Sequence, residues 1–247
     1  MSYLGRGSNS CVLLTGFPDW IEWGFGFLWA FVLWCFHRAN GRPTRALLLL
    51  LGWSLLHSVL AHFGFYQNTD AMPPRFGFVL IPAFVILLVS LLPRYRNRYL
   101  AHRDLRYGTL LHTVRFPVEL TLFALYEFGA VPELMTFAGR NYDILIGLSA
   151  PLMFLLLLKK RIRRNLLIAW NVLGLMLLLF ILGNAVLSAE LPIQQFAFDQ
   201  PNRAPLHFPF ILLPAVIVPV AVWTHLTDLI FLIRYRNESV LTAQIPV

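Results

Sequence analysis

One apolar stretch of the sequence carries three ionisable residues at the spacing of a helix face. His112, Arg115 and Glu119 lie three and four residues apart, which would place them within a sector of about 60° on a helix. Tyr126 extends the same face. At this spacing Arg115 and Glu119 can also form a direct ion pair. The pattern predicts a ligand-binding or proton-relay site, and an ion pair that only fixes helix packing is the alternative.

The segments around these residues predict that the site lies inside a membrane. The 247-residue chain is 58% hydrophobic and only 13% charged, too little polar sequence for a soluble domain of this length. A helix needs about 20 apolar residues to cross the hydrocarbon core. We therefore expect an all-α, polytopic protein with a single domain, 1–247. Its seven predicted spans are 20–37, 45–65, 76–93, 108–128, 142–158, 165–189 and 207–233.

The positive charges predict the orientation of these spans. Most of the 20 Lys and Arg residues lie in the loops 38–45, 94–106 and 159–164 and in the tail after residue 233. The positive-inside rule makes these segments cytoplasmic, with the N-terminus outside and the C-terminus inside. The net charge of +8 then favours contact with membrane lipid headgroups, and we expect no nucleic-acid partner.

The depth of Arg115 and Glu119 strengthens the functional interpretation. At 1.5 Å per residue, both would lie near the middle of the bilayer. A charge there costs several kcal/mol unless it is paired or hydrated, so both side chains should face the bundle interior. Pro117 lies between them, removes one backbone donor and predicts a kink. The last span, 207–233, contains no lysine for a retinal Schiff base.

A second polar patch lies near the inner end of the last span. It consists of Thr224, His225 and Asp228. A histidine and a carboxylate three residues apart on a helix can relay protons. The simpler interpretation is a helix end that meets the headgroup region.

Other polar residues gather at the predicted outer mouth. They are His57, His62, Arg140, Asn141, Asp143, Asp199 and His207. Either Asn141 or Asp143 can cap the fifth span, where a carboxylate meets the positive end of the helix dipole. The loop around Asp199 is interpreted as a lid over the bundle or as a simple turn. His62 and His207, with Glu190 or Asp199, could also hold a zinc ion.

Two resemblances bear on function. The Ser58–His62 spacing is similar to one motif of the seven-helix metal hydrolases that include the alkaline ceramidases. The last span departs from that family, because His225-Leu-Thr-Asp228 replaces its His-x-x-x-His pair. Separately, the segments MTFAGRNYDI (135–144) and FAFDQPN (196–202) resemble an uncharacterised bacterial seven-helix family over about 115–228. That resemblance implies a multi-pass protein of the bacterial inner (plasma) membrane and brings no activity.

An internal similarity suggests transport. Residues 76–85 read like 208–217, and each copy is followed by Arg-Tyr-Arg-Asn, at 94–97 and 234–237. This fits a parallel 3+1+3 repeat with 108–128 as the connector, an arrangement known from small transporters. We expect a protein that binds, and in one version transports, a small or amphiphilic, anionic ligand. The alternatives are a metal-dependent lipid hydrolase and a non-catalytic sensor or partner protein; the ligand's identity stays open.

Overall fold

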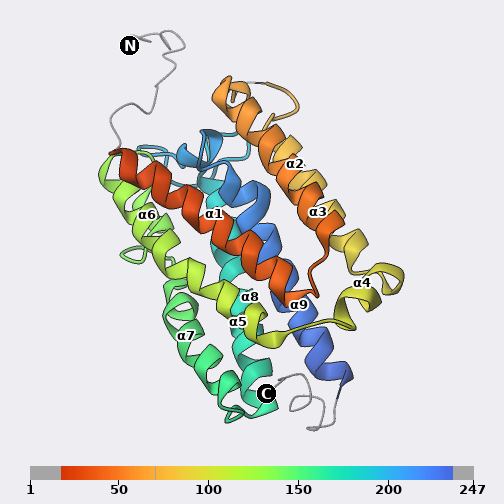
Figure 1. Ribbon diagram of the computed structural model, residues 1–247. Coiled ribbons are helices and arrows are strands. Elements are labelled where there is room, and N and C mark those ends of the chain that lie inside the picture. Colours follow the sequence, from red (N-terminus) through yellow and green to blue (C-terminus); the bar gives the residue numbers. More distant parts are fainter. Residues whose placement is uncertain (1–17, 70, 236–247) are drawn as a thin grey trace, which may run out of the picture.

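The computed structural model describes residues 18–69 and 71–235, and within these ranges the chain is helical with no strand (Figure 1). The α-helices are α1 (Asp19–Ala39), α2 (Thr44–His62), α3 (Gly77–Ser90), α4 (Pro93–Leu100), α5 (Leu105–Leu111), α6 (Arg115–Glu127), α7 (Ile144–Leu158), α8 (Arg164–Ser188) and α9 (Val218–Arg234). Shorter turns are η1 (Phe65–Gln67), η2 (His112–Val114), η3 (Glu133–Met135), η4 (Ala204–Leu206) and η5 (Leu213–Ile217).

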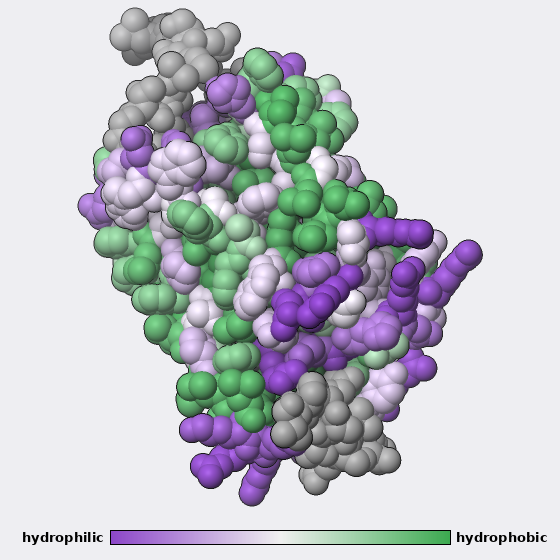
Figure 2. Space-filling model, viewed as in Figure 1, coloured by the Kyte–Doolittle hydropathy of each residue, from purple (hydrophilic) through white to green (hydrophobic). Residues whose placement is uncertain are grey.

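Three helices are long and apolar enough to cross a membrane. They are Thr44–His62, Arg164–Ser188 and Leu213–Arg234. The pair α3 and α4 passes the same test together, but it is bent by 75°. The surface agrees with this finding, because Figure 2 shows apolar residues over α2 and α3 and hydrophilic residues around α4 and the lower end of the molecule. These features are compatible with a membrane protein.

The last helix lies at the centre of the bundle. In its most apolar window, 78% of residues are buried, against 17% in α2. In Figure 1, α1 and α6 lie in front of α8 and α9, and α2 and α3 lie to one side. Because α9 is enclosed by protein, it can carry polar side chains that would be costly against lipid.

Prolines explain where the helices differ from the expected segments. The expected helix 108–128 is divided by the 3₁₀ turn η2, one turn before Pro117, which cannot donate to the carbonyl of Thr113. The expected helix 207–233 begins only at Leu213, with the π-helical η5. The expected loop 94–106 contains most of α4. Pro93 suits the first position of a helix, and the chain turns by 75° between α3 and the new helix that begins there.

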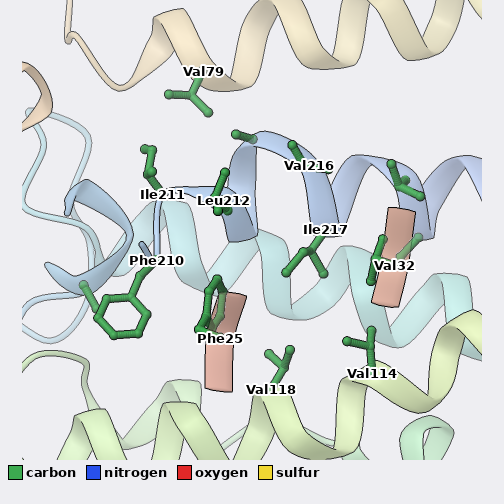
Figure 3. Close-up of a cluster of buried hydrophobic side chains, with 14 of the residues drawn as sticks. Phe25, Val32, Val79, Val114, Val118, Phe210, Ile211, Leu212, Val216 and Ile217 are labelled. Atoms are coloured by element: carbon green, nitrogen blue, oxygen red, sulfur yellow. The ribbon is translucent and has the colours of Figure 1, made fainter. Parts of the chain in front are cut away.

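The apolar core joins four elements around α9. Figure 3 shows Phe25 of α1, Val118 of α6 and Ile217 of η5 directed toward one another, with Val79 of α3 on the far side of η5. All four are buried. In a membrane, close packing holds such contacts together more than transfer from water does. This core packs α6 and η5 around α1, and η5 leads directly into α9, so the core holds the helices that carry the candidate site.

Candidate functional site

Arg115, the first residue of α6, is the centre of a buried polar network. Its side chain is 4% exposed. Nη1 donates to Oδ1 of Asp143 at 2.9 Å and to the carbonyl of Gly174 at 3.2 Å. Nη2 lies 2.9 Å from Nε2 of His225. One guanidinium thus joins α6, the residue before α7, α8 and α9.

Gly174 makes this meeting of helices sterically feasible. A Cβ at this position would lie 2.6 Å from Cε1 and 2.8 Å from Nε2 of His225. No side chain larger than hydrogen fits there without displacing the imidazole. Since the carbonyl of Gly174 also accepts from Arg115, α8 contributes both the space and an acceptor.

The hydrogen bonds around His225 define its tautomer. The amide nitrogen of Asn171 donates to the carbonyl of Leu167 at 2.9 Å, so its Oδ1 is turned toward the imidazole. His225 Nδ1 lies 2.8 Å from this Oδ1 and donates to it. Nε2 therefore carries a lone pair and accepts from Arg115, because a guanidinium is always a donor. His225 is neutral in this arrangement.

His112 stacks on His225, and its own hydrogen-bonding capacity is open. The ring centroids are 3.8 Å apart and the planes differ by 12°. His112 is fully buried, and neither ring nitrogen has a hydrogen-bond partner among the described residues. Buried polar groups are nearly always paired with protein or water. One donor and one acceptor of this imidazole are therefore unused among the described residues.

Glu119 is hydrogen-bonded to a residue other than Arg115, although the helical spacing would allow those two to pair. Oε1 accepts from the amide of Asn141, which also donates to the carbonyl of Met135 at 3.1 Å. Oε2 is buried and has no partner among the described residues. Arg115 and Glu119 therefore have separate partners: Arg115 pairs with Asp143, and Glu119 accepts from Asn141.

A cavity of about 80 Å³ lies against this network. Four of its lining residues are polar members of the network, namely Arg115, Glu119, Asn141 and Asp143. Most of the rest are apolar and come from α3, α6, α8, the η4 turn, η5 and α9. A water needs roughly 15 Å³ by this measure, so there is room for a few waters or one small polar group. The cavity has a polar end and apolar walls.

A second buried cluster lies further along α9. Arg103, whose side chain is 0% exposed, donates to Asp228 at 2.6 Å and to Asn40 at 2.8 Å. It also donates to the backbone carbonyl of Thr224 at 3.3 Å. The hydroxyl of Thr224 and Oδ2 of Asp228 have no partner among the described residues. The predicted patch is therefore divided, with His225 in the Arg115 network and Asp228 paired with Arg103.

Sequence reasoning missed Arg103, Asn40 and Asn171. In the sequence Arg103 is one of many loop charges and does not stand out. The signal that could have found it is Asp228, because a carboxylate inside an apolar segment requires a partner. Asn171 interrupts the apolar sequence of α8 and is a visible signal. Asn40 lies one residue beyond α1 and offers none.

At the outer mouth, His57 belongs to a structural contact. Its Nδ1 hydrogen-bonds the hydroxyl of Tyr66 in η1. Burial raises the pKa of Tyr66 to about 12, so the phenol stays protonated and donates to the imidazole. This bond ties the connector after α2 to the helix. His62, five residues on, is exposed and takes no part in it.

The other outer residues are dispersed rather than gathered. Arg140 lies over the ring of Phe196 at 5.6 Å, and Asp199 is exposed. Tyr126 is half-buried, and its backbone carbonyl, not its hydroxyl, accepts from the amide of Gln200. Of the predicted outer residues, only Asn141 and Asp143 reach the Arg115 network.

The candidate metal ligands are not brought together. Glu190 pairs with Arg203 at 2.7 Å, and His207 Nδ1 lies 3.1 Å from the carbonyl of the same arginine. Burial lowers the pKa of His207, which keeps its imidazole neutral. Across residues 18–69 and 71–235, no three His, Cys, Asp or Glu side chains are grouped to hold a metal ion. The expected site of His62, His207 and Glu190 is therefore not assembled.

Comparison with known proteins gives a family and no activity. A family described as a domain of unknown function (DUF8737) matches residues 72–233, which is more than half of the chain. The chain belongs to this family. No curated protein and no solved structure matches it. The matched region contains Arg115, Glu119, Asn141, Asp143 and His225, so the Arg115 network lies within the family domain.

Proposed function

We propose that this protein is a seven-span membrane protein that binds a small or amphiphilic ligand in the cavity beside Arg115 and Glu119. In this proposal the N-terminus lies outside and the C-terminus in the cytoplasm. Support comes from helices near each of the seven expected segments and from three that could cross a membrane. The basic inner loops supply the orientation.

The observation that carries the proposal is a buried carboxylate with one open oxygen in a cavity. Oε2 of Glu119 and Nε of Arg115 are buried without partners among the described residues, and both residues line the cavity. A group that donates to the carboxylate and accepts from the guanidinium would satisfy both. Hydroxyl and carboxylic acid groups have this property, and a cavity of about 80 Å³ has room for one such group, so we place the polar head of the ligand there.

The charge of Arg115 is already balanced by Asp143. A fully ionised anion would have to compete with that carboxylate, so we refine the expected anionic ligand to one with both donor and acceptor capacity. We favour transport as the use of such a site. A ligand at mid-membrane can reach either side only if the helices move, and such movement is what a transporter provides. The 3+1+3 repeat remains part of this proposal; Arg236 and Asn237 of its second copy lie outside the described residues.

Native mass spectrometry of the full chain in mild detergent tests the proposal. We expect the wild-type protein to release a bound small molecule, and the Glu119→Leu variant to lose it. Glu127→Gln is the matched control, because Glu127 ends the same helix and is exposed. Thermal unfolding of each variant separates loss of the ligand from loss of the fold.

Two results would overturn the proposal. One is wild-type protein with no bound molecule after extraction in several mild detergents. The other is unchanged retention in a folded Glu119→Leu variant, which would place any bound molecule elsewhere.

A further inference from the structure

A long apolar groove lies on the other side of α9 from the Arg115 cavity. Helices α2 and α3 each pack against η5, yet they pack little against each other. The space between them is about 580 Å³. Its walls include Leu49, Gly52 and Leu56 of α2 and Ala83, Ile86 and Leu87 of α3. Its floor is formed by η5 and α9.

A second, basic pocket adjoins one end of this groove. This pocket is about 420 Å³ and is lined by Arg42, Arg45, Arg98 and His102. Ala46 and Tyr99 line both spaces, so the basic pocket adjoins the apolar groove. Figure 2 shows hydrophilic residues around α4 directly below the apolar surface of α2 and α3.

The N-terminus of α2 adds anion-binding capacity to the basic pocket. Thr44, Arg45 and Ala46, in the first turn, line the pocket. The N-cap is Pro43, no side chain caps the helix, and the first turn contains no acidic residue. Free backbone N–H groups and the positive end of the helix dipole therefore meet the same space as the arginines.

The loop that carries these groups is held in a defined conformation. Gly41 and Arg42 have positive φ angles of 70° and 60°. A Cβ on Gly41 would lie 2.4 Å from Cβ of His102, so only glycine allows the loop to approach the segment after α4 this closely. Asn40 accepts from buried Arg103 at 2.8 Å and fixes the start of the loop. The basic pocket is thus a built site.

We propose that the groove and the basic pocket bind one anionic phospholipid of the cytoplasmic leaflet. The phosphate lies between Arg42, Arg45 and the N-terminus of α2, and an acyl chain occupies the groove along α2 and α3. The charge pattern selects this occupant, because an apolar partner helix would bring no anion to the basic pocket, whereas a phospholipid carries an anionic headgroup at one end of its acyl chains. Both spaces fall within the ~300–1,000 Å³ of typical ligand sites. The inference rests on the membrane orientation given under the proposed function, with α2 and α3 in the membrane, and it does not depend on a ligand at Glu119.

The glycines of this chain allow a sharp test. An added Cβ at Gly52 meets nothing within 4 Å, and Gly52 lines the groove, so Gly52→Leu places an apolar side chain in that space. Gly183 of α8 is equally open and gives the matched control Gly183→Leu. For the charges, Arg42→Gln with Arg45→Gln tests the pocket. Arg161→Gln with Arg163→Gln removes two exposed charges from a different basic loop.

The experiment titrates each full-length variant in detergent with phosphatidylglycerol or phosphatidylcholine, followed by native mass spectrometry. We expect the wild-type protein to retain one phosphatidylglycerol in preference to phosphatidylcholine. Each arginine lost from the pocket should weaken retention about fivefold, as for a basic residue near an anionic lipid surface. Gly52→Leu should weaken retention of both lipids, and the two controls should match the wild type.

The variants also distinguish a lipid held in the groove from lipid drawn to any basic loop. Equal retention in all variants, or an equal loss with Arg161→Gln and Arg163→Gln, would show only general attraction to basic loops and would overturn the proposal. Displacement of the lipid by millimolar inorganic phosphate alone would overturn the role of the groove. Glu119→Leu should leave this lipid bound. A negative result for the ligand proposed at Glu119 would therefore leave the lipid proposal standing.

Discussion

Nη2 of Arg115 donates to Nε2 of His225 at 2.9 Å, although the two residues are 110 positions apart in sequence. The contact joins the first turn of α6 to the middle of α9. It requires a neutral imidazole, because a protonated Nε2 would face a cation. The network therefore depends on the carboxylate of Asp143 to balance the single charge at its centre.

Removal of that carboxylate should be severely destabilising. In Asp143→Ala the buried guanidinium loses its counter-charge, and breaking a buried pair by deleting one partner costs about 3–5 kcal/mol. Thermal or chemical unfolding in detergent measures this. Glu190→Gln is the control, because its pair with Arg203 is about one-third exposed and should contribute less than about 1 kcal/mol. Similar losses for both variants would contradict a special role for Asp143.

Gly108 should be intolerant of even one methyl group. A Cβ there would lie 2.6 Å from Oδ2 of Asp228 and 2.8 Å from Nη2 of Arg103, and these two buried side chains form an ion pair through Oδ1 and Nε. We expect Gly108→Ala to lower the unfolding free energy by about 1–3 kcal/mol, as overpacking does. Gly183→Ala adds the same methyl group in open space and should be neutral or stabilising. Equal stability of the two variants would show that the Arg103 cluster is loosely packed.

Asn171 should matter more than a neighbouring asparagine on the same helix. Asn171 and Asn184 each donate to the carbonyl four residues earlier in α8, but Asn171 also accepts from His225 on α9. Asn171→Leu leaves a buried imidazole N–H unsatisfied, at about 1–3 kcal/mol. Asn184→Leu should cost distinctly less in the same unfolding assay. The reverse order would argue against the assigned tautomer of His225.

The bond between Tyr66 and His57 should give an alkaline signature. Burial raises the pKa of Tyr66 from 10.0 to about 12, so the folded protein holds this proton more tightly than the unfolded chain. Its contribution to stability is complete below pH 10 and is lost as the pH rises toward 12. Tyr66→Phe should therefore be less stable than wild type at pH 8, with a smaller difference near pH 12. Tyr142→Phe, at an exposed tyrosine, should show no such convergence.

The sequence predicted helices because the signals were local. Apolar runs, basic loops and prolines locate most helix ends within a few residues of those observed. What it did not predict depends on contacts between distant segments. The 3₁₀ turn at His112–Val114 and the π-helical turn at Leu213–Ile217 both adjust backbone already enclosed by other helices.

The candidate site was predicted only in part, because the sequence shows local spacing and does not show contacts between distant segments. The face of His112, Arg115 and Glu119 was visible from helical spacing. The partners Asp143 and His225 came from other segments, and one sequence cannot show which of several polar residues pair. Arg115 and Glu119 were close enough to bond, yet each found better geometry with the segment before α7.

The enclosure of α9 has a consequence for the divergence of related sequences. A helix with neighbours on every side can change a side chain only if a neighbour changes in compensation, whereas a helix that faces lipid accepts any apolar residue of similar length. The substitutions that separate relatives should therefore accumulate on the outer faces of α2 and α3. In α9 they should occur as correlated pairs with α6 or α8. Covariation between residues 115 and 225, once many relatives are aligned, would then report the contact between α6 and α9.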